Sequence, residues 1–194
     1  MRTVLEIDGL FDGTTAMSGA AVVIEDGQIT WVGKRSRAPK TPKGERSRSL
    51  KAGGSFALPG LINCHAHLTL DGSADFDAET RQSEAAAALK AFRNARLTVR
   101  SGVTTVRDLG ANGSMVVELA RQIERGALEG PRIIASARGI TITGGHGMEV
   151  GRIADGPDAV RAATREQVAV GATWRSCSRR RRSSRPRPPP RSRR

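Results

Sequence analysis

The sequence predicts an α/β protein, and three observations carry that prediction. Residues 3–33 alternate short β-prone runs with turns, and residues 58–174 alternate strand-like and helix-like segments. Residues 175–194 consist of Arg, Ser and Pro with a single Cys. Strands that alternate with helices are typical of a parallel sheet covered by helices. We therefore expect a β-rich segment over residues 1–57, an α/β unit over residues 58–174 and a disordered basic tail over residues 175–194.

The first 33 residues predict a small antiparallel β unit. The runs AAVVIE and QITWVG flank Asp26 and Gly27. An Asp-Gly pair between two β-prone runs is a strong hairpin signal, because glycine tolerates the positive φ of such turns. Residues 34–54 are polar and rich in Lys, Arg, Pro and Gly, which predicts a solvated surface connection. An anion-binding role for this basic loop is the less favoured alternative.

Residues 58–174 predict three strands, each followed by a helix. The expected strands are Leu61–Cys64, Val103–Val106 and Arg132–Ala137. The expected helices are about Glu79–Arg100, Ser114–Arg125 and Pro157–Val170. In the first helix, Leu89, Phe92 and Val99, together with Ala88 and Ala95, recur at helical spacing and should face the interior. A fourth strand should begin at residues 172–174.

The stretch LPGLINCHAHL, Leu58–Leu68, carries the clearest chemical signal. A turn and a short apolar run precede His65 and His67. Residues two apart on an extended strand point to the same face, so both imidazoles should converge at the strand's end. Two such imidazoles supply two of the nitrogen ligands of a zinc-like ion, whereas an incidental surface pair is the alternative. Cys64, in the apolar run, is expected to be a buried free thiol.

Several linked motifs resemble the amidohydrolase superfamily. They are VVIEDGQITWVG, the LPGLINCHAHL stretch, SGVTTVRDLG, GPRIIASARGITITGGHG and ADGPDAVRAATREQVAVGATW. The resemblance covers residues 1–174 and points to the branch with imidazolonepropionase-like enzymes and metal-dependent Xaa-Pro-type dipeptidases. It implies that residues 1–57 belong to a composite β-sandwich domain. It also implies that residues 58–174 are the first three βα units of an incomplete TIM-type (β/α)8 barrel, which in full takes about 250 residues.

The resemblance implies a metal-dependent hydrolase of C–N bonds in a small amide, cyclic amide or dipeptide. In the complete enzyme His65 and His67 would hold a divalent metal, with zinc as the expected ion and one or two ions per site. A carbamylated lysine on the fourth strand, two later histidines and an aspartate would complete the ligands. The metal would activate water and polarise the carbonyl, while the aspartate takes the proton. The residues after Trp174 read RSCSRRRR, without that lysine, so we expect this chain to be inactive as it stands.

Two further side chains are candidates for the active-site face. Asp108 and His146 follow the second and third strands, and active-site groups collect at the C-terminal ends of strands in α/β barrels. Either residue would contact the substrate or support the metal ligands. A capping or turn carboxylate is the equally weighted alternative for Asp108. For His146 the alternative is a loop histidine that binds nothing.

The net charge of +13 belongs to the tail, because residues 175–194 hold ten Arg and no acid. Residues 1–174 carry 22 basic and 19 acidic side chains. One interpretation of the tail is nucleic-acid binding through charge, but residues 1–174 contain no recognition motif, so no specific nucleic-acid partner is expected. The favoured interpretation is a frameshifted reading of a GC-rich gene, because a shifted frame can restore the family's continuation. A third interpretation is that the chain is a fragment that pairs with a full-length homologue. The sequence does not indicate an oligomeric state.

No apolar run of signal-peptide or membrane-spanning length is present. A soluble cytoplasmic protein without a membrane partner is therefore the expectation.

Overall fold

A computed structural model of the chain describes residues 1–73, 75–174, 177 and 178. The chain divides into two compact units, Met1–Pro59 and Gly60–Arg194. The tail predicted over residues 175–194 lies outside the described residues, apart from residues 177 and 178.

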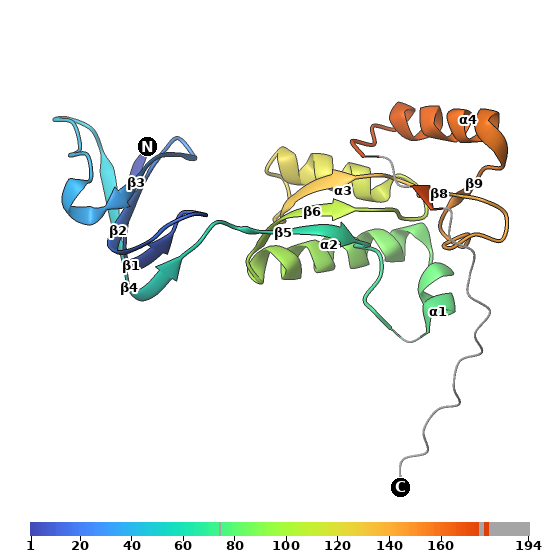
Figure 1. The fold of residues 1–194 in the computed structure, drawn as a ribbon, viewed down its shortest axis with the longest axis horizontal. Coiled ribbons are helices and arrows are strands. Elements are labelled where there is room, and N and C mark those ends of the chain that lie inside the picture. The colour runs from blue at the N-terminus through green and yellow to red at the C-terminus, as the bar shows by residue number, and fades with distance from the viewer. Residues whose placement is uncertain (74, 175–176, 179–194) are drawn as a thin grey trace, which may run out of the picture. The chain divides into compact units, whose positions relative to one another are not determined.

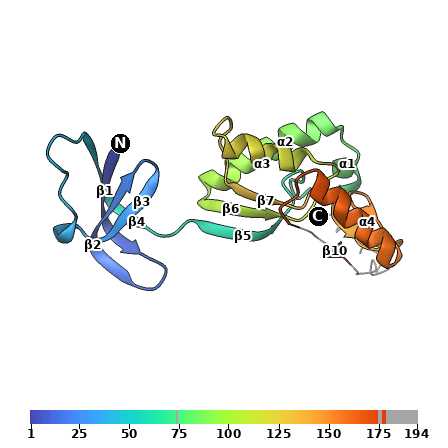
Figure 2. The ribbon, with the colours of Figure 1, turned by 90° about the horizontal axis from the view of Figure 1, so that it is seen from above.

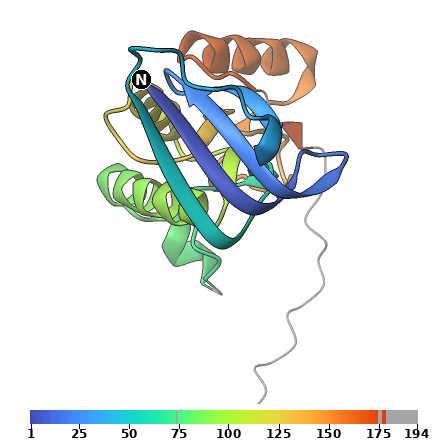
Figure 3. The same cartoon turned by 90° about the vertical axis from the view of Figure 1, so that its left-hand side faces the viewer.

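The first unit is a four-stranded sheet in the order β3-β2-β1-β4 (Figure 3). Its strands are β1 (Arg2–Phe11), β2 (Ala16–Glu25), β3 (Gln28–Lys34) and β4 (Ser47–Ala57). The hairpin between β2 and β3 is confirmed, since the strands are antiparallel and Asp26 and Gly27 have φ values of 48° and 80°. Positive φ at both positions matches the type I′ turn, whose twist suits a hairpin. A small core forms on this sheet from Ile7, Leu10, Ala20 and Val22.

The predicted connection over residues 34–54 is wrong in its second half. A short 3-10 helix, Arg35–Arg37, follows β3, but Ser47–Ala57 form a strand parallel to β1. Nine of the eleven β4 residues are exposed and the other two are half-buried, so buried and exposed positions do not alternate along the strand. Its backbone pairing with β1 therefore holds it in place, and that pairing leaves no pattern in the sequence.

The second unit contains a parallel sheet in the order β5-β6-β7 (Figure 1). The strands are β5 (Leu61–Ala66), β6 (Val103–Asp108) and β7 (Arg132–Ala135). Helices α1 (Phe76–Thr80) and α2 (Glu84–Arg100) connect β5 to β6, and α3 (Met115–Glu124) connects β6 to β7. Figure 2 shows α2 and α3 on the same side of the sheet. This alternation of parallel strands and helices confirms the α/β prediction.

The single helix predicted over Glu79–Arg100 is two helices. Ser83 separates them and caps α2, because its Oγ accepts a hydrogen bond from the Ala86 backbone N–H at 3.2 Å. The buried stripe of α2 consists of Ala87, Ala91 and Ala95. Of the predicted inward positions, Ala95 is buried and Phe92 and Val99 are half-buried. Ala88 is exposed and Leu89 is 72% exposed, so the prediction is wrong for these two. Small side chains form the stripe because they allow α2 to pack closely on its neighbours.

A second small parallel sheet, in the order β10-β8-β9, follows β7. It consists of β8 (Ile140–Thr141), β9 (Arg152–Ile153) and β10 (Cys177–Ser178), and α4 (Gly156–Ala169) packs against it through Ala163. The fourth strand expected at residues 172–174 is not formed as a strand. The backbone N–H groups of Thr173 and Trp174 nevertheless donate to the Ala135 carbonyl at 2.9 and 3.0 Å, so these residues run beside the end of β7.

No helix among the described residues is long and apolar enough to cross a membrane.

Candidate metal centre

His65 and His67 lie side by side at the C-terminal end of β5. Their ring centroids are 5.4 Å apart and the rings are inclined at 69°. Two imidazoles bound to one zinc ion through nitrogens at about 2 Å would have ring centres about 5 Å apart. The two rings are therefore spaced as ligands of a single ion would be.

The His67 ring has its own hydrogen-bond partner. Its Nδ1 atom lies 2.8 Å from the carbonyl oxygen of Gly110. A carbonyl only accepts, so Nδ1 carries the hydrogen of the neutral ring and Nε2 keeps its lone pair. Histidines that bind metals usually donate their other ring N–H to a carbonyl or carboxylate in this way. The hydrogen bond to Gly110 thus leaves the lone pair of His67 Nε2 without a proton.

Gly110, which holds the His67 ring, has to be glycine. Its φ is +141°, and a Cβ atom there would lie 2.9 Å from the backbone nitrogen of Gly139. Such a conformation is open almost only to glycine, and the contact is too short for a carbon atom. The sequence signal was the glycine just after the second strand, in RDLG, but its partner lies 43 residues away.

Asp108 is fully buried at the end of β6, with 0% of its surface exposed. Its Oδ2 accepts a hydrogen bond from the Leu68 backbone N–H at 2.7 Å, and its Oδ1 accepts one from the Gly110 N–H at 3.0 Å. Burial raises the pKa of the Asp108 carboxyl, while the two backbone N–H groups and His67 act in the opposite direction. The Asp108 carboxylate therefore bonds both to Leu68, the residue after His67, and to Gly110, whose carbonyl contacts the His67 ring. The bond to Gly110 lies within one turn, as for a turn carboxylate, whereas the bond to Leu68 joins residues 40 positions apart.

His146 lies apart from the pair. It is exposed in the loop between β8 and β9, where its carbonyl accepts a hydrogen bond from Thr141 Oγ1 at 3.0 Å. No group of three or more His, Cys, Asp or Glu side chains in the described part of the chain could hold a metal ion. The structure thus brings His65 and His67 together and leaves His146 outside.

Cys64 is a free and exposed thiol, so its predicted burial is wrong. The physical reason is the position of β5 at the edge of its sheet. Leu61 and Ile62 on the same strand are 52% and 66% exposed. An apolar run therefore did not mean a buried strand.

Arg107 was not predicted as part of the site. Its Nε donates to the Cys64 carbonyl at 2.7 Å, and its guanidinium carbon lies 4.6 Å from the centre of the Trp174 ring. It therefore connects β5, beside the histidines, with the segment that runs along β7. A lone Arg at the end of a strand gives no sequence signal for two such distant partners.

A family model described as the Amidohydrolase family matches residues 56–182. The ochratoxinase of Aspergillus niger is 28% identical over 183 residues, covering 80% of this chain and 37% of that protein. An imidazolonepropionase of Ralstonia nicotianae is 36% identical over 70 residues, covering 36% of this chain and 17% of that protein. The chain spans well under half the length of both.

Solved structures are similar to the chain as well. A Xaa-Pro dipeptidase with bound methionine in its active site matches with a TM-score of 0.78 and 26% identity, over 91% of this chain and 47% of that one. The crystal structure of the Aspergillus niger ochratoxinase matches with a TM-score of 0.76 and 25% identity, over 91% of this chain and 46% of that one.

Proposed function

Because the chain belongs to the amidohydrolase family, we propose that it carries the first metal-binding strand of a hydrolase that cleaves the C–N bond of a small amide or dipeptide. The names of the ochratoxinase, the imidazolonepropionase and the Xaa-Pro dipeptidase support this substrate class. The observation that carries the proposal is the His65 and His67 pair, with ring centroids 5.4 Å apart and Nδ1 of His67 held by a carbonyl.

The proposed ligands are the imidazoles of His65 and His67, and the proposed ion is divalent, with zinc as the expected metal. The ring spacing and the free Nε2 of His67 fit such an ion. A bound divalent ion supplies Lewis-acid chemistry, which polarises a scissile carbonyl and lowers the pKa of water. The protein's own part is to hold the His67 proton on Nδ1 through the Gly110 carbonyl. Asp108 has a positioning role, because it fixes the backbone on both sides of that contact.

We propose that β5, β6 and β7 with their helices correspond to the first three βα units of a TIM-type barrel. Two observations support this assignment. The exposed Leu61 and Ile62 on the edge strand β5 are the side chains that a neighbouring barrel strand would cover. Thr173 and Trp174 already bond to β7 at the place of a fourth strand. The sheet of Met1–Pro59 is then one part of the family's β-sandwich domain.

The 194-residue chain alone is proposed to be inactive. A catalytic zinc site ordinarily has three protein ligands, and the described residues bring two together. Purified chain should therefore show no metal-dependent hydrolysis of dipeptides.

Sequencing the gene around codons 170–200 tests the frameshift hypothesis, because an in-frame lysine followed by a long open frame would supply the missing ligands. Nothing in the described part of the chain favours the nucleic-acid alternative.

The metal assignment is tested by titrating the chain with Co(II) and following its absorption. His65→Ala and His67→Ala should each weaken binding at least about tenfold, since each removes one of two ligands. His146→Ala is the matched control and should bind Co(II) as the wild type does. Equal binding by all three variants would place the ion elsewhere and would contradict the proposal.

A further inference from the structure

We propose that Asn94, on α2, is a positioning residue for the metal-binding imidazole of His67. The metal part of this inference rests on the proposed function, whereas the placement of the ring is a property of the protein alone.

Asn94 holds the backbone directly after His67. Its Nδ2 donates hydrogen bonds to the carbonyls of Leu68 at 2.9 Å and of Leu70 at 3.0 Å. The N–H of Leu68 is held from the opposite side by Asp108 Oδ2, at 2.7 Å. The Leu68 side chain is 4% exposed and packs in the main core. The residue after His67 is therefore fixed at its N–H, its carbonyl and its side chain.

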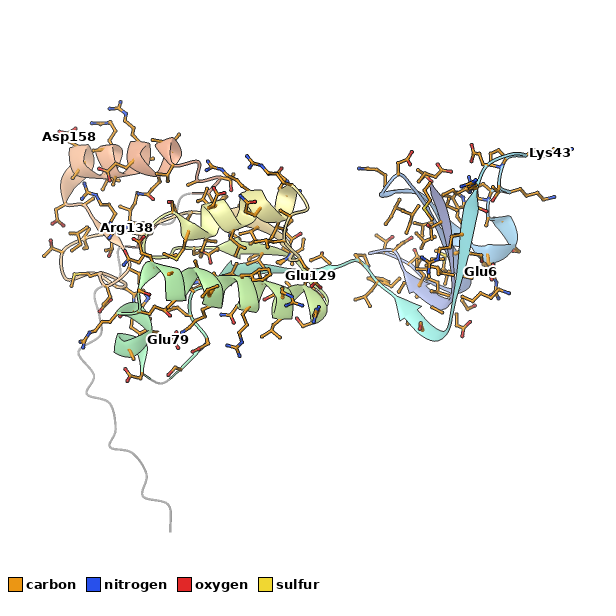
Figure 4. The ribbon with its side chains drawn as sticks, turned by 180° about the vertical axis from the view of Figure 1, so that it is seen from behind. Glu6, Lys43, Glu79, Glu129, Arg138 and Asp158 are labelled. Atoms are coloured by element: carbon orange, nitrogen blue, oxygen red, sulfur yellow. The ribbon has the colours of Figure 1, made fainter. Side chains whose placement is uncertain are left out.

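The segment that Asn94 holds, residues 68–73, has no regular secondary structure to fix it. Within it, the Leu70 backbone N–H donates to the His67 carbonyl at 3.0 Å. Side chains further along the chain supply other bonds. Gln82 Nε2 donates to the Thr69 carbonyl at 3.0 Å. Glu79 on α1, labelled in Figure 4, accepts from the backbone N–H groups of Asp71 at 3.0 Å and Ser73 at 2.8 Å. Among Asn94, Gln82 and Glu79, Asn94 bonds to the residue nearest to His67 along the chain, Leu68.

Asn94 uses both hydrogens of its amide group in these two bonds. An amide NH2 group has two hydrogens, and here one carbonyl accepts each of them. Without this donor, the carbonyls of Leu68 and Leu70 lose their partner at a half-buried position, where an unpaired backbone group is costly. The backbone is then expected to rotate toward water. That rotation would carry the His67 ring away from the Gly110 carbonyl and remove the acceptor that favours the Nδ1–H form of the ring.

The test uses the full chain and the Asn94→Asp variant, which keeps the side-chain shape but removes the donor. Nitrogen-15 NMR at a pH of about 8.5, at which free imidazole is neutral, reads which ring nitrogen carries the hydrogen. His67 should be in the Nδ1–H form in the wild type and should shift toward the Nε2–H form in Asn94→Asp. His146 should not change. Thr98→Ala, one turn further along α2, is the matched control and should leave His67 unchanged.

Metal affinity supplies the second readout. Asn94→Asp should weaken Co(II) binding by about tenfold, the lower range for loss of a group that orients a ligand. A folded Asn94→Asp variant that keeps both the Nδ1–H form of His67 and the wild-type affinity overturns the proposal. If the wild type binds no Co(II) but the tautomer shifts, Asn94 positions the ring and the metal assignment fails instead. Should Asn94→Asp not fold, Asn94→Ala and Asn94→Gln decide, because only the latter keeps the donor. Equal tautomers in those two variants also overturn the proposal.

Discussion

The imidazole Nδ1 of His67 and the carbonyl oxygen of Gly110 lie 2.8 Å apart, although 43 residues separate them in the sequence. The contact exists because β5 and β6 are parallel neighbours, so the segments that follow both strands leave the sheet at the same edge. The backbone after β6 thereby becomes part of the candidate metal centre. It supplies no ligand, but it determines which nitrogen of His67 is available to an ion.

Gly110→Ala should disturb both the fold and this contact. The added Cβ would lie 2.9 Å from the Gly139 nitrogen in a backbone conformation that side chains rarely adopt. A loss of about 1–3 kcal/mol in the free energy of unfolding is expected, as for other strained backbone positions. Urea unfolding measures the loss, and Co(II) titration should show weaker binding.

Gly113→Ala is the matched control for that prediction. Gly113 also has a positive φ, +98°, but the atom nearest to an added Cβ there, Glu84 Oε1, would lie at an ordinary 3.7 Å. Gly113→Ala should therefore cost stability without changing Co(II) binding. If the two variants weaken Co(II) binding equally, the close approach at Gly110 has no special part in the site.

Asp108→Asn should destabilise the second unit although it removes only a charge. The carboxylate accepts two backbone N–H groups in a fully buried place, whereas an amide can accept one and turns its own NH2 toward the other. An unsatisfied buried group costs about 1–3 kcal/mol in the free energy of unfolding. Asp12→Asn is the control, because Asp12 also accepts two backbone N–H groups, those of Thr14 and Thr15, but in an exposed turn and both on Oδ1. Equal costs in urea unfolding would contradict the role given to burial.

The local features of this fold could be predicted from the sequence because their signals are local. The Asp26 and Gly27 turn follows from the positive φ of a tight hairpin. The convergence of His65 and His67 follows from the two-residue period of a strand, and the structure places the two rings 5.4 Å apart. The helix after Gly110 was predicted within about a residue at either end.

Other features could not be predicted because they depend on partners distant in the sequence. β4 forms through pairing with β1, and Cys64 is exposed because β5 lies at a sheet edge. The role of Asn94 depends on a segment 24 to 26 residues earlier in the chain. From the sequence alone, an Asn inside a helix is only a weak helix former, and nothing indicates which groups its side chain binds.

Arg107→Lys should loosen the link between β5 and the segment beside β7. Lysine lacks the planar group that stacks on Trp174 while Nε bonds to the Cys64 carbonyl. A loss of about 0.5–1 kcal/mol in the free energy of unfolding is expected for a partly exposed pair. Trp174 fluorescence, measured in a Trp31→Phe background, should change with it.

Arg96→Lys is the matched control for the Arg107 prediction. Arg96 also lies over an aromatic ring, Phe92, but at 5.8 Å and with its Nε bonded to the exposed Glu129. Arg96→Lys should leave Trp174 fluorescence unchanged. An unchanged Trp174 signal in Arg107→Lys as well would show that the guanidinium does not hold the indole.

Acid should weaken the contact between the loop that carries His146 and the start of α4, because Asp155 makes this contact. Thr143 donates to this carboxylate from its hydroxyl at 2.5 Å and its backbone N–H at 2.9 Å, and these bonds hold the pKa of Asp155 below its ordinary value. A carboxyl with a lowered folded-state pKa binds protons more readily in the unfolded chain. Its contribution to stability is therefore present above the ordinary carboxyl pKa of about 3.9 and is lost as the pH falls through the lowered value.

Urea unfolding between about pH 5 and pH 2.5 should show this loss in the wild type and less of it in Asp155→Asn, which cannot titrate. Thr143→Val removes the hydroxyl donor but keeps the backbone N–H, so its acid sensitivity should lie between the two. Because both variants act on one pair of residues, their effects on the acid response should not add in the double variant. Additive effects, or an acid response in Asp155→Asn as steep as in the wild type, would show that another carboxylate governs the acid stability of this unit.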